Sequence, residues 1–145
     1  MPEAERPDCL FCRIIAGEEE AAFVLDEPEV VAFLDSRPLF HGHTLVLPRA
    51  HRETLPDVPA AEVGPYFETV QLLARAVPRA MEAEGTFVAL NNVVSQSVPH
   101  LHTHVVPRVR KDGLRGFFWP RTKYDSAEQM EEVAQRIRST IEQLR

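Results

Sequence analysis

The chain has 145 residues, of which 44% are hydrophobic, and its formal net charge is −6. This length and composition suffice for one domain with a hydrophobic core. The negative charge argues against a general nucleic-acid-binding role, which usually needs a basic surface, although imidazoles, amides and helix N-termini still allow a local anion site. No apolar run reaches membrane-spanning length, and Met1 to Asp8 is polar without a signal-peptide core, so we expect a cytoplasmic protein.

Residues 1–8 contain two prolines and charges of both signs, and we interpret them as a flexible N-terminal arm. We expect a single domain over residues 9–145, because no repeat, low-complexity tract or linker interrupts it. This domain opens with residues 9–17, whose pattern predicts a short helical turn that ends at Gly17.

Five segments have the composition of β-strands: residues 21–26, 30–35, 43–47, 86–90 and 98–108. A turn at residues 27–29 should join the first two strands into an antiparallel hairpin. Pro48 ends the third strand.

Two segments have a helical period. In residues 60–84, apolar side chains recur at spacings of three and four at Val63, Phe67, Val70, Ala74, Val77 and Met81. Pro65 fits the first turn of this helix, whereas Pro78 should kink it or break it in two.

The second helix closes the chain, after a segment from Lys111 to Tyr124 that is rich in aromatic residues. Those aromatics fit either simple packing or a role beside a leaving group or a dimer interface. Ser126 and Gln129 match a capping box. The apolar stripe that follows consists of Met130, Val133, Ile137, Ile141 and Leu144. Five strands and two main helices, segregated along the chain, predict an α+β fold.

Three of the six histidines stand at every second position: His100, His102 and His104. In an extended strand they would line one face, about 6.6–6.8 Å from one to the next. Neutral imidazoles suit nucleophiles, proton carriers, phosphate donors or metal ligands. The plainer interpretation is a strand with three surface histidines.

Cys9 and Cys12 form a CxxC pair, which is a common half of a zinc site. His51 and His100 would complete a closed tetrahedral set of two cysteines and two histidines. The alternatives are two free thiols or a redox pair, although the βαβ context of a thioredoxin-like motif is missing.

Residues 91–97 (Asn-Asn-Val-Val-Ser-Gln-Ser) precede the histidines. Their short polar side chains suit hydrogen bonds to phosphate oxygens and a leaving group. An ordinary polar loop is the alternative.

The sequence His-Leu-His-Thr-His-Val-Val at residues 100–106 resembles the motif of the histidine-triad (HIT) family. Residues 9–18, 31–35, 42–51 and 96–99 resemble the family's opening, its middle strands and the approach to its triad. The resemblance runs from about residue 9 to about 108, and it is to zinc-containing, bacterial-type nucleotide hydrolases and transferases.

The resemblance implies an antiparallel five-stranded sheet with a long central helix and a C-terminal helix, usually in a homodimer whose sheets join. It also implies cleavage at the α-phosphate of an adenosine nucleotide, such as a phosphoramidate or a dinucleoside polyphosphate. A nucleotide-binding module that senses its ligand with little turnover is the alternative, and a zinc protein whose histidines serve only as ligands is a third.

Carried over by position, His102 is the nucleophile that forms a covalent nucleotidyl-histidine, and His104 donates to the α-phosphate. The other expected contacts are His43 for the histidine network, Gln96 and Ser97 for the phosphate and leaving group, Asp35 for the ribose, and Asn91 for phosphate or ribose. The expected ligands of a structural zinc are Cys9, Cys12, His51 and His100.

The chain departs from the family pattern in the loop before the triad. Ser95 stands where the family usually has glycine, and residues 91–96 are two residues shorter than the common pattern. His41 matches no role in the family.

Overall fold

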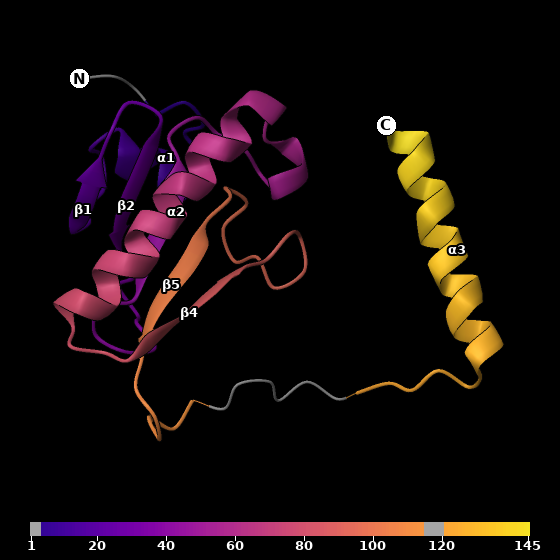
Figure 1. Ribbon diagram of the computed structural model, residues 1–145. Coiled ribbons are helices and arrows are strands. Elements are labelled where there is room, and N and C mark those ends of the chain that lie inside the picture. Colours follow the sequence, from indigo (N-terminus) through magenta and orange to yellow (C-terminus); the bar gives the residue numbers. More distant parts are fainter. Residues whose placement is uncertain (1–3, 115–120) are drawn as a thin grey trace. The chain divides into compact units, whose positions relative to one another are not determined.

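The computed structural model describes residues 4–114 and 121–145 (Figure 1). They belong to two compact units, Met1–Asp112 and Gly113–Arg145. The first unit holds the helices Leu10–Ile15 (α1) and Ala60–Ala80 (α2), the 3₁₀ turn Leu55–Asp57 (η1) and all strands of the sheet. The second unit holds the helix Ala127–Leu144 (α3). A single domain over residues 9–145 therefore stays a prediction.

The five strands form one antiparallel sheet in the order β1-β2-β3-β5-β4. Their bounds are Phe23–Asp26 (β1), Val30–Leu34 (β2), Thr44–Pro48 (β3), Gly85–Leu90 (β4) and Thr103–Arg108 (β5). This arrangement confirms the predicted α+β fold with a five-stranded antiparallel sheet, a long central helix and a C-terminal helix. No described helix is long and apolar enough to cross a membrane.

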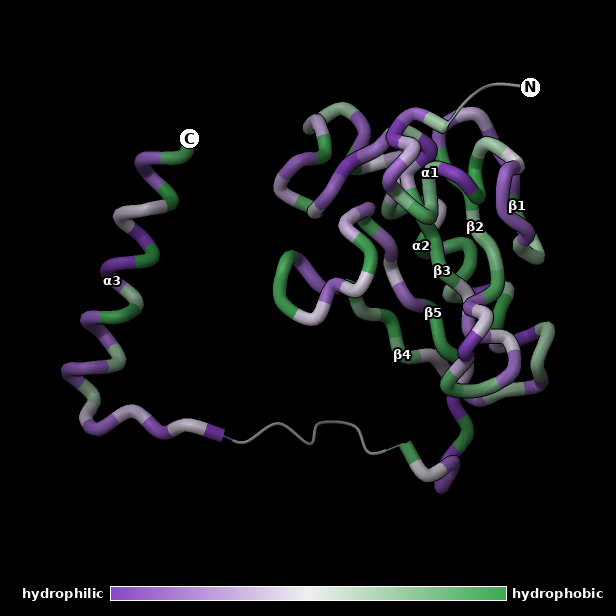
Figure 2. The backbone as a smooth tube through the Cα atoms, turned by 180° about the vertical axis from the view of Figure 1, so that it is seen from behind, coloured by the Kyte–Doolittle hydropathy of each residue, from purple (hydrophilic) through white to green (hydrophobic). Residues whose placement is uncertain are grey.

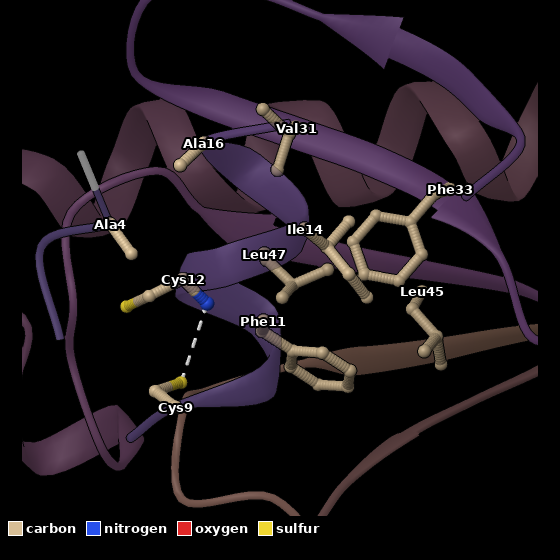
Figure 3. Packing of buried hydrophobic residues seen from close by; sticks show 10 residues of the cluster. All are labelled: Ala4, Cys9, Phe11, Cys12, Ile14, Ala16, Val31, Phe33, Leu45 and Leu47. Atoms are coloured by element: carbon tan, nitrogen blue, oxygen red, sulfur yellow. Dashed lines mark hydrogen bonds between the residues drawn. The ribbon is translucent and has the colours of Figure 1, made fainter. Parts of the chain in front are cut away.

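The two faces of the sheet are covered by different helices, and the strand alternation decides which side chains each receives. Val31, Phe33 and Leu47 pack with α1, and Figure 3 shows Phe11 and Ile14 of that helix beside the side chains of these strands. The alternate strand residues, such as Val46, pack with α2. Removing this apolar surface from water supplies the main driving force that holds the unit together.

The buried face of α2 differs from the predicted stripe. Its buried residues are Tyr66, Val70, Leu73 and Val77, whereas Phe67 and Met81 are 37% and 43% exposed. The Tyr66 ring is buried because its hydroxyl donates to the Val46 carbonyl at 2.8 Å and pairs with the Thr103 hydroxyl at 2.6 Å. Because its hydroxyl group is hydrogen-bonded, Tyr66 can be buried in the core, although the predicted apolar stripe did not include it.

The first alternative for Pro78, a kink in the helix, stays a prediction, whereas the second, a break in two, is wrong because α2 continues to Ala80. Pro78 lies in the last turn of the helix, where few backbone hydrogen bonds remain to be lost.

The last strand begins at Thr103, not at Val98 as predicted. Before it, the His100 amide donates to the Val98 carbonyl at 2.8 Å, and the Leu101 amide donates to the Arg52 carbonyl at 2.6 Å. The chain before Thr103 is therefore tied to the segment after β3 rather than to β4. The alternation still holds, because Leu101 and Val105 are both fully buried on the α2 side.

Residues 4–8 belong to the predicted arm, and they contact the sheet unit. Ala4 is buried, and the Glu5 carboxylate accepts a hydrogen bond from the His51 amide at 2.9 Å. Flexibility of the arm stays a prediction.

At the start of α3, the Ser126 hydroxyl accepts from the Gln129 amide at 3.0 Å, as the capping box predicts. The Gln129 side chain returns to the Asp125 amide rather than to that of Ser126. Of the predicted aromatic segment, Phe117, Phe118 and Trp119 lie outside the described residues.

Candidate functional site

The four predicted zinc ligands meet at one buried point between α1 and the ends of two strands. Their side-chain ligand atoms all lie within 4.8 Å of one another: Cys9, Cys12, His51 and His100. Cys9 caps α1, and its sulfur accepts from the Cys12 amide at 3.4 Å, so the short helix turns both sulfurs to one side (Figure 3).

His100 holds the tautomer that a metal ligand needs. Its Nε2–H donates to the Pro48 carbonyl at 2.8 Å, which leaves a lone pair on Nδ1. That Nδ1 lies 3.6 Å from the sulfurs of both Cys9 and Cys12. Burial lowers the pKa of His100 to about 4, so the ring is neutral at pH 7.

The other two groups complete the donor set. The His51 Nδ1 lies 3.2 Å from the Cys12 sulfur, and the His51 Nε2 is buried without a hydrogen-bond partner among the described residues. The nearest carboxylate is Glu53, 4.0 Å away. Burial, with a smaller contribution from Cys9, raises the pKa of the Cys12 thiol to about 12.

Zinc fits this set. Zinc–sulfur and zinc–nitrogen bonds of about 2.3 and 2.0–2.1 Å at tetrahedral angles separate a sulfur from a nitrogen ligand by about 3.5 Å. The observed sulfur–nitrogen separations of 3.2 and 3.6 Å match that spacing. In a metal-bound histidine, the N–H of the other ring nitrogen usually donates to a carboxylate. For His51, the nearest carboxylate is that of Glu53.

Beside this cluster lies a cleft of about 740 Å³. Its lining combines polar groups with an apolar wall formed by Leu10, Phe11, Ile14, Phe33 and Leu45. Four of the predicted substrate residues line the cleft: Asp35, Ser97, His102 and His104. A mainly apolar cavity with a few convergent polar groups is the usual form of a small-molecule site.

His102 is oriented by the backbone of its own segment. Its Nδ1–H donates to the His100 carbonyl at 2.8 Å, so Nε2 keeps its lone pair. The ring is 6% exposed and makes an edge contact with Phe11, with the centroids 5.0 Å apart. Burial lowers the pKa of His102, which keeps the imidazole neutral and nucleophilic at pH 7.

His104 is placed as a hydrogen-bond donor by a relay that begins in the loop before β3. The Leu39 amide donates to the His43 Nδ1 at 3.0 Å, so the proton of a neutral His43 must lie on Nε2. That Nε2 is 2.9 Å from the His104 Nδ1, which therefore accepts. The proton of a neutral His104 then lies on its Nε2.

Two features hold the relay. Gly42, with φ of +96°, turns the chain ahead of His43, and a β-carbon there would lie 2.6 Å from the Met81 side chain. The Asp35 carboxylate lies 3.6 Å from the His43 Nε2. Burial, followed by the neighbouring His102 and His43, lowers the pKa of His104 to about 4.

Asp35, His43 and His104 also have ligand atoms within 4.8 Å of one another. A metal on the His43 Nε2 would have to displace the proton from that atom. Because the Leu39 amide already points at the Nδ1, the ring has no other nitrogen to receive it. The relay thus favours proton positioning over metal binding at these three residues.

Three predicted substrate residues do not line the cleft: His43, which contacts His104 instead, Gln96 and Asn91. The Gln96 amide accepts from the Val93 amide at 2.9 Å and donates to the Glu53 carbonyl at 2.5 Å. Asn91 donates to the Ser95 carbonyl at 3.3 Å. The Asn91 side chain thus braces its own loop, and the Gln96 side chain also ties this loop to Glu53, so their contacts to a phosphate stay a prediction.

Two parts of the site were not predicted from the sequence: the apolar wall, and the Leu39 amide that fixes the proton of His43. Phe11 lies inside the CxxC motif, and this was the one signal that pointed to it. Leu39 acts through its backbone amide, for which the sequence carries no signal.

A family model for the HIT domain matches residues 16–111, which is more than half of the chain. This chain belongs to the HIT family. The adenylylsulfatase HINT3 of Arabidopsis thaliana is 33% identical over 109 residues, and the match covers 74% of this chain but only 55% of that protein. The adenosine 5'-monophosphoramidase HNT1 of Candida albicans is 28% identical over 123 residues, with 81% of each chain covered.

Solved structures of HIT proteins share the fold. A HIT family member from Bacillus subtilis superimposes with a TM-score of 0.82 at 33% identity, covering 91% of this chain and 96% of the other. A zinc-bound histidine triad family protein from Mycobacterium smegmatis gives a TM-score of 0.71 at 34% identity, covering 86% and 89%.

The loop of this HIT domain before the triad carries backbone strain. Ser95 has φ of +62° and Val93 has φ of +70°, a region that favours glycine. We expect Ser95→Gly to raise the free energy of unfolding by about 1 kcal/mol, measured by urea denaturation. Ser95→Ala keeps the β-carbon and should give no such gain. Equal stabilisation by both variants would contradict the strain.

The triad of this HIT domain should work at lower pH than free imidazole allows. A lowered pKa keeps a histidine neutral until the pH falls below that value, so the acid limb of any turnover by this triad should lie below pH 6.5. The same shifts add stability that is complete above pH 6.5 and declines as the pH falls toward about 4, the folded-state pKa of His104. A pH–rate profile, with circular dichroism at each pH, tests this. An acid limb centred at 6.5 would contradict it.

Proposed function

We propose that this HIT protein is a nucleotide hydrolase or nucleotidyltransferase that acts at the α-phosphate of an adenosine nucleotide. The observation that carries the proposal is the fixed tautomer of His102, whose Nδ1–H is held by the His100 carbonyl at 2.8 Å. A neutral imidazole with a free Nε2 at a cleft is suited to nucleophilic attack. Relatives named as an adenylylsulfatase and an adenosine 5'-monophosphoramidase support the substrate class.

In the first half of the reaction, the His102 Nε2 attacks the α-phosphorus. A phosphorus–nitrogen bond forms, and the bond to the leaving group breaks with its electron pair going to that group. Sulfate or phosphate departs directly, whereas an amine departs once its nitrogen has taken a proton from water. The His100 carbonyl, which accepts from His102 Nδ1–H, stabilises the positive charge that develops on the ring.

In the second half, water attacks the same phosphorus and releases one proton to the solvent. The phosphorus–His102 bond breaks, its electron pair returns to Nε2, and the nucleoside monophosphate leaves. An acceptor other than water would make the protein a transferase. The His104 Nε2–H, fixed by the relay from Leu39 and His43, is suited to stabilise charge on a phosphate oxygen in both halves.

The remaining cleft residues suggest how the nucleotide is held. The apolar wall around Phe11 and Phe33 suits the flat face of a base, and Asp35 suits the ribose hydroxyls. Ser97 lies where it can reach the phosphate or the leaving group. We keep Gln96 and Asn91 as proposed substrate contacts only if their loop rearranges, because both side chains are engaged elsewhere.

We also propose a structural zinc on Cys9, Cys12, His51 and His100. Bound there, zinc would tie α1 to the ends of two strands and take no part in the reaction. The zinc-bound relative and the fitting donor distances support this assignment. The two free cysteines also support the proposal that the protein is cytoplasmic.

The decisive experiment traps the intermediate. The protein is mixed with adenosine 5'-phosphoramidate, adenylyl sulfate or a diadenosine polyphosphate, quenched in denaturant, and analysed by intact and peptide mass spectrometry. We expect an adenylyl adduct on His102 and release of adenosine monophosphate. Side-by-side turnover then ranks the leaving groups. Tight nucleotide binding without turnover of any of them would favour the alternative of a sensing module.

We further propose that the sheets of two copies of this chain join at β4. This strand lies at one edge of the sheet, and its Val88 is 42% exposed. Placing like charges at that edge with Val88→Lys should raise the dimer dissociation constant, measured by sedimentation. Val24→Lys, on the opposite edge strand β1, is the matched control. Equal effects of the two substitutions would contradict pairing at β4.

A further inference from the structure

Along helix α3, hydrophobic positions recur between hydrophilic ones (Figure 2), and their spacing of three and four residues places them on one face of the helix. The face consists of Met130, Val133, Ile137, Ile141 and Leu144. Within the described part of the unit Gly113–Arg145, Ile137 is 58% and Leu144 is 83% exposed. A helix with such a stripe normally buries it against another element.

The spacing of the stripe is symmetric. Its residues follow one another at intervals of three, four, four and three, so Ile137 is the midpoint. When two such helices lie antiparallel about Ile137, Met130 falls opposite Leu144 and Val133 falls opposite Ile141. Each apolar residue then meets an apolar partner.

Acidic and basic side chains are unevenly distributed along α3. Residues 125–134 hold four acidic and no basic side chains, whereas residues 135–145 hold three arginines and one glutamate. A parallel pair would set the acidic halves against each other. An antiparallel pair about Ile137 instead sets residues 129–134 against residues 140–145, which hold one arginine and one glutamate, so it avoids this repulsion and also opposes the two helix dipoles.

We propose that α3 is an interaction surface for a second copy of this chain, and that two α3 helices pair antiparallel about Ile137. The apolar stripe supplies the contact, and the charge separation selects the direction. This contact is separate from the proposed joining of sheets at β4.

Cysteine cross-linking tests the pairing in the full-length chain. Met130→Cys and Leu144→Cys are prepared separately and treated with a short bis-maleimide, alone and as an equal mixture. We expect a species of twice the chain mass in the mixture and little in either sample alone. Ile137→Cys alone should cross-link to itself. The controls are Gln135→Cys, on the opposite side of the helix, and the unmodified chain, whose Cys9 and Cys12 are buried.

Each outcome decides the proposal. Cross-linking of Met130→Cys to itself would indicate a parallel pair and overturn the antiparallel arrangement. Absence of cross-links in the mixture and in Ile137→Cys, with helix content unchanged by circular dichroism, would overturn the pairing itself and indicate that another partner covers the stripe. Because the readout is position-specific, a dimer held only at β4 cannot produce the expected pattern.

Discussion

His102→Ala will reduce kcat/KM for release of adenosine monophosphate by on the order of 10⁴-fold or more, and it will remove the covalent adduct. The loss is large because one side chain supplies the attacking atom in both halves of the proposed reaction. Its surroundings favour a small structural effect, since the ring lies at a cleft and, among the described residues, hydrogen-bonds to the His100 carbonyl alone. Steady-state turnover and quenched mass spectrometry give the two readouts.

Two further variants make the result specific. His41→Ala removes an exposed histidine that does not line the cleft, and it should leave kcat/KM unchanged. His104→Ala removes a donor rather than the nucleophile, so it should slow turnover by about 10²–10³-fold while still allowing an adduct on His102. If His102→Ala turned over substrate at the wild-type rate or still formed the adduct, the proposed mechanism would be contradicted.

The sequence predicted that the histidines of the triad lie on the strand face opposite Leu101 and Val105, because alternation depends only on extended backbone. Leu101 and Val105 turn to the α2 side, and His102 and His104 turn to the cleft, although regular pairing begins only at Thr103. Strand boundaries depend on hydrogen-bond partners far away in the chain, here the Arg52 carbonyl, and no local pattern specifies these.

The sequence did not predict burial that depends on hydrogen bonds formed only in the tertiary structure. Tyr66 replaced Phe67 on the buried face because its hydroxyl reaches Val46 and Thr103, across the helix–sheet interface. The donor role of His104 rests on the Leu39 amide, so only the folded loop explains a role that the family resemblance could merely suggest.

Removing zinc with a chelator should lower the free energy of unfolding of the wild-type chain and leave that of Cys12→Ser almost unchanged. When free zinc exceeds its dissociation constant about a thousandfold, binding to the native state adds about 4 kcal/mol. Because burial raises the pKa of the Cys12 thiol to about 12, zinc must displace a proton there, and its affinity should weaken as the pH falls. Denaturation with and without chelator, together with metal analysis, measures both effects.

Substitutions at His102 and Cys12 test whether the proposed zinc site and the proposed reaction site are separate. His102→Ala should retain zinc and its full stabilisation, because the ligand atoms belong to Cys9, Cys12, His51 and His100. Cys12→Ser should lose zinc, and any loss of turnover in it should follow the loss of stability, since no ligand of the cluster lines the cleft. Loss of zinc in His102→Ala would show that the neighbouring histidines form one metal site, and it would overturn the assignment of His100 to structure and His102 to chemistry.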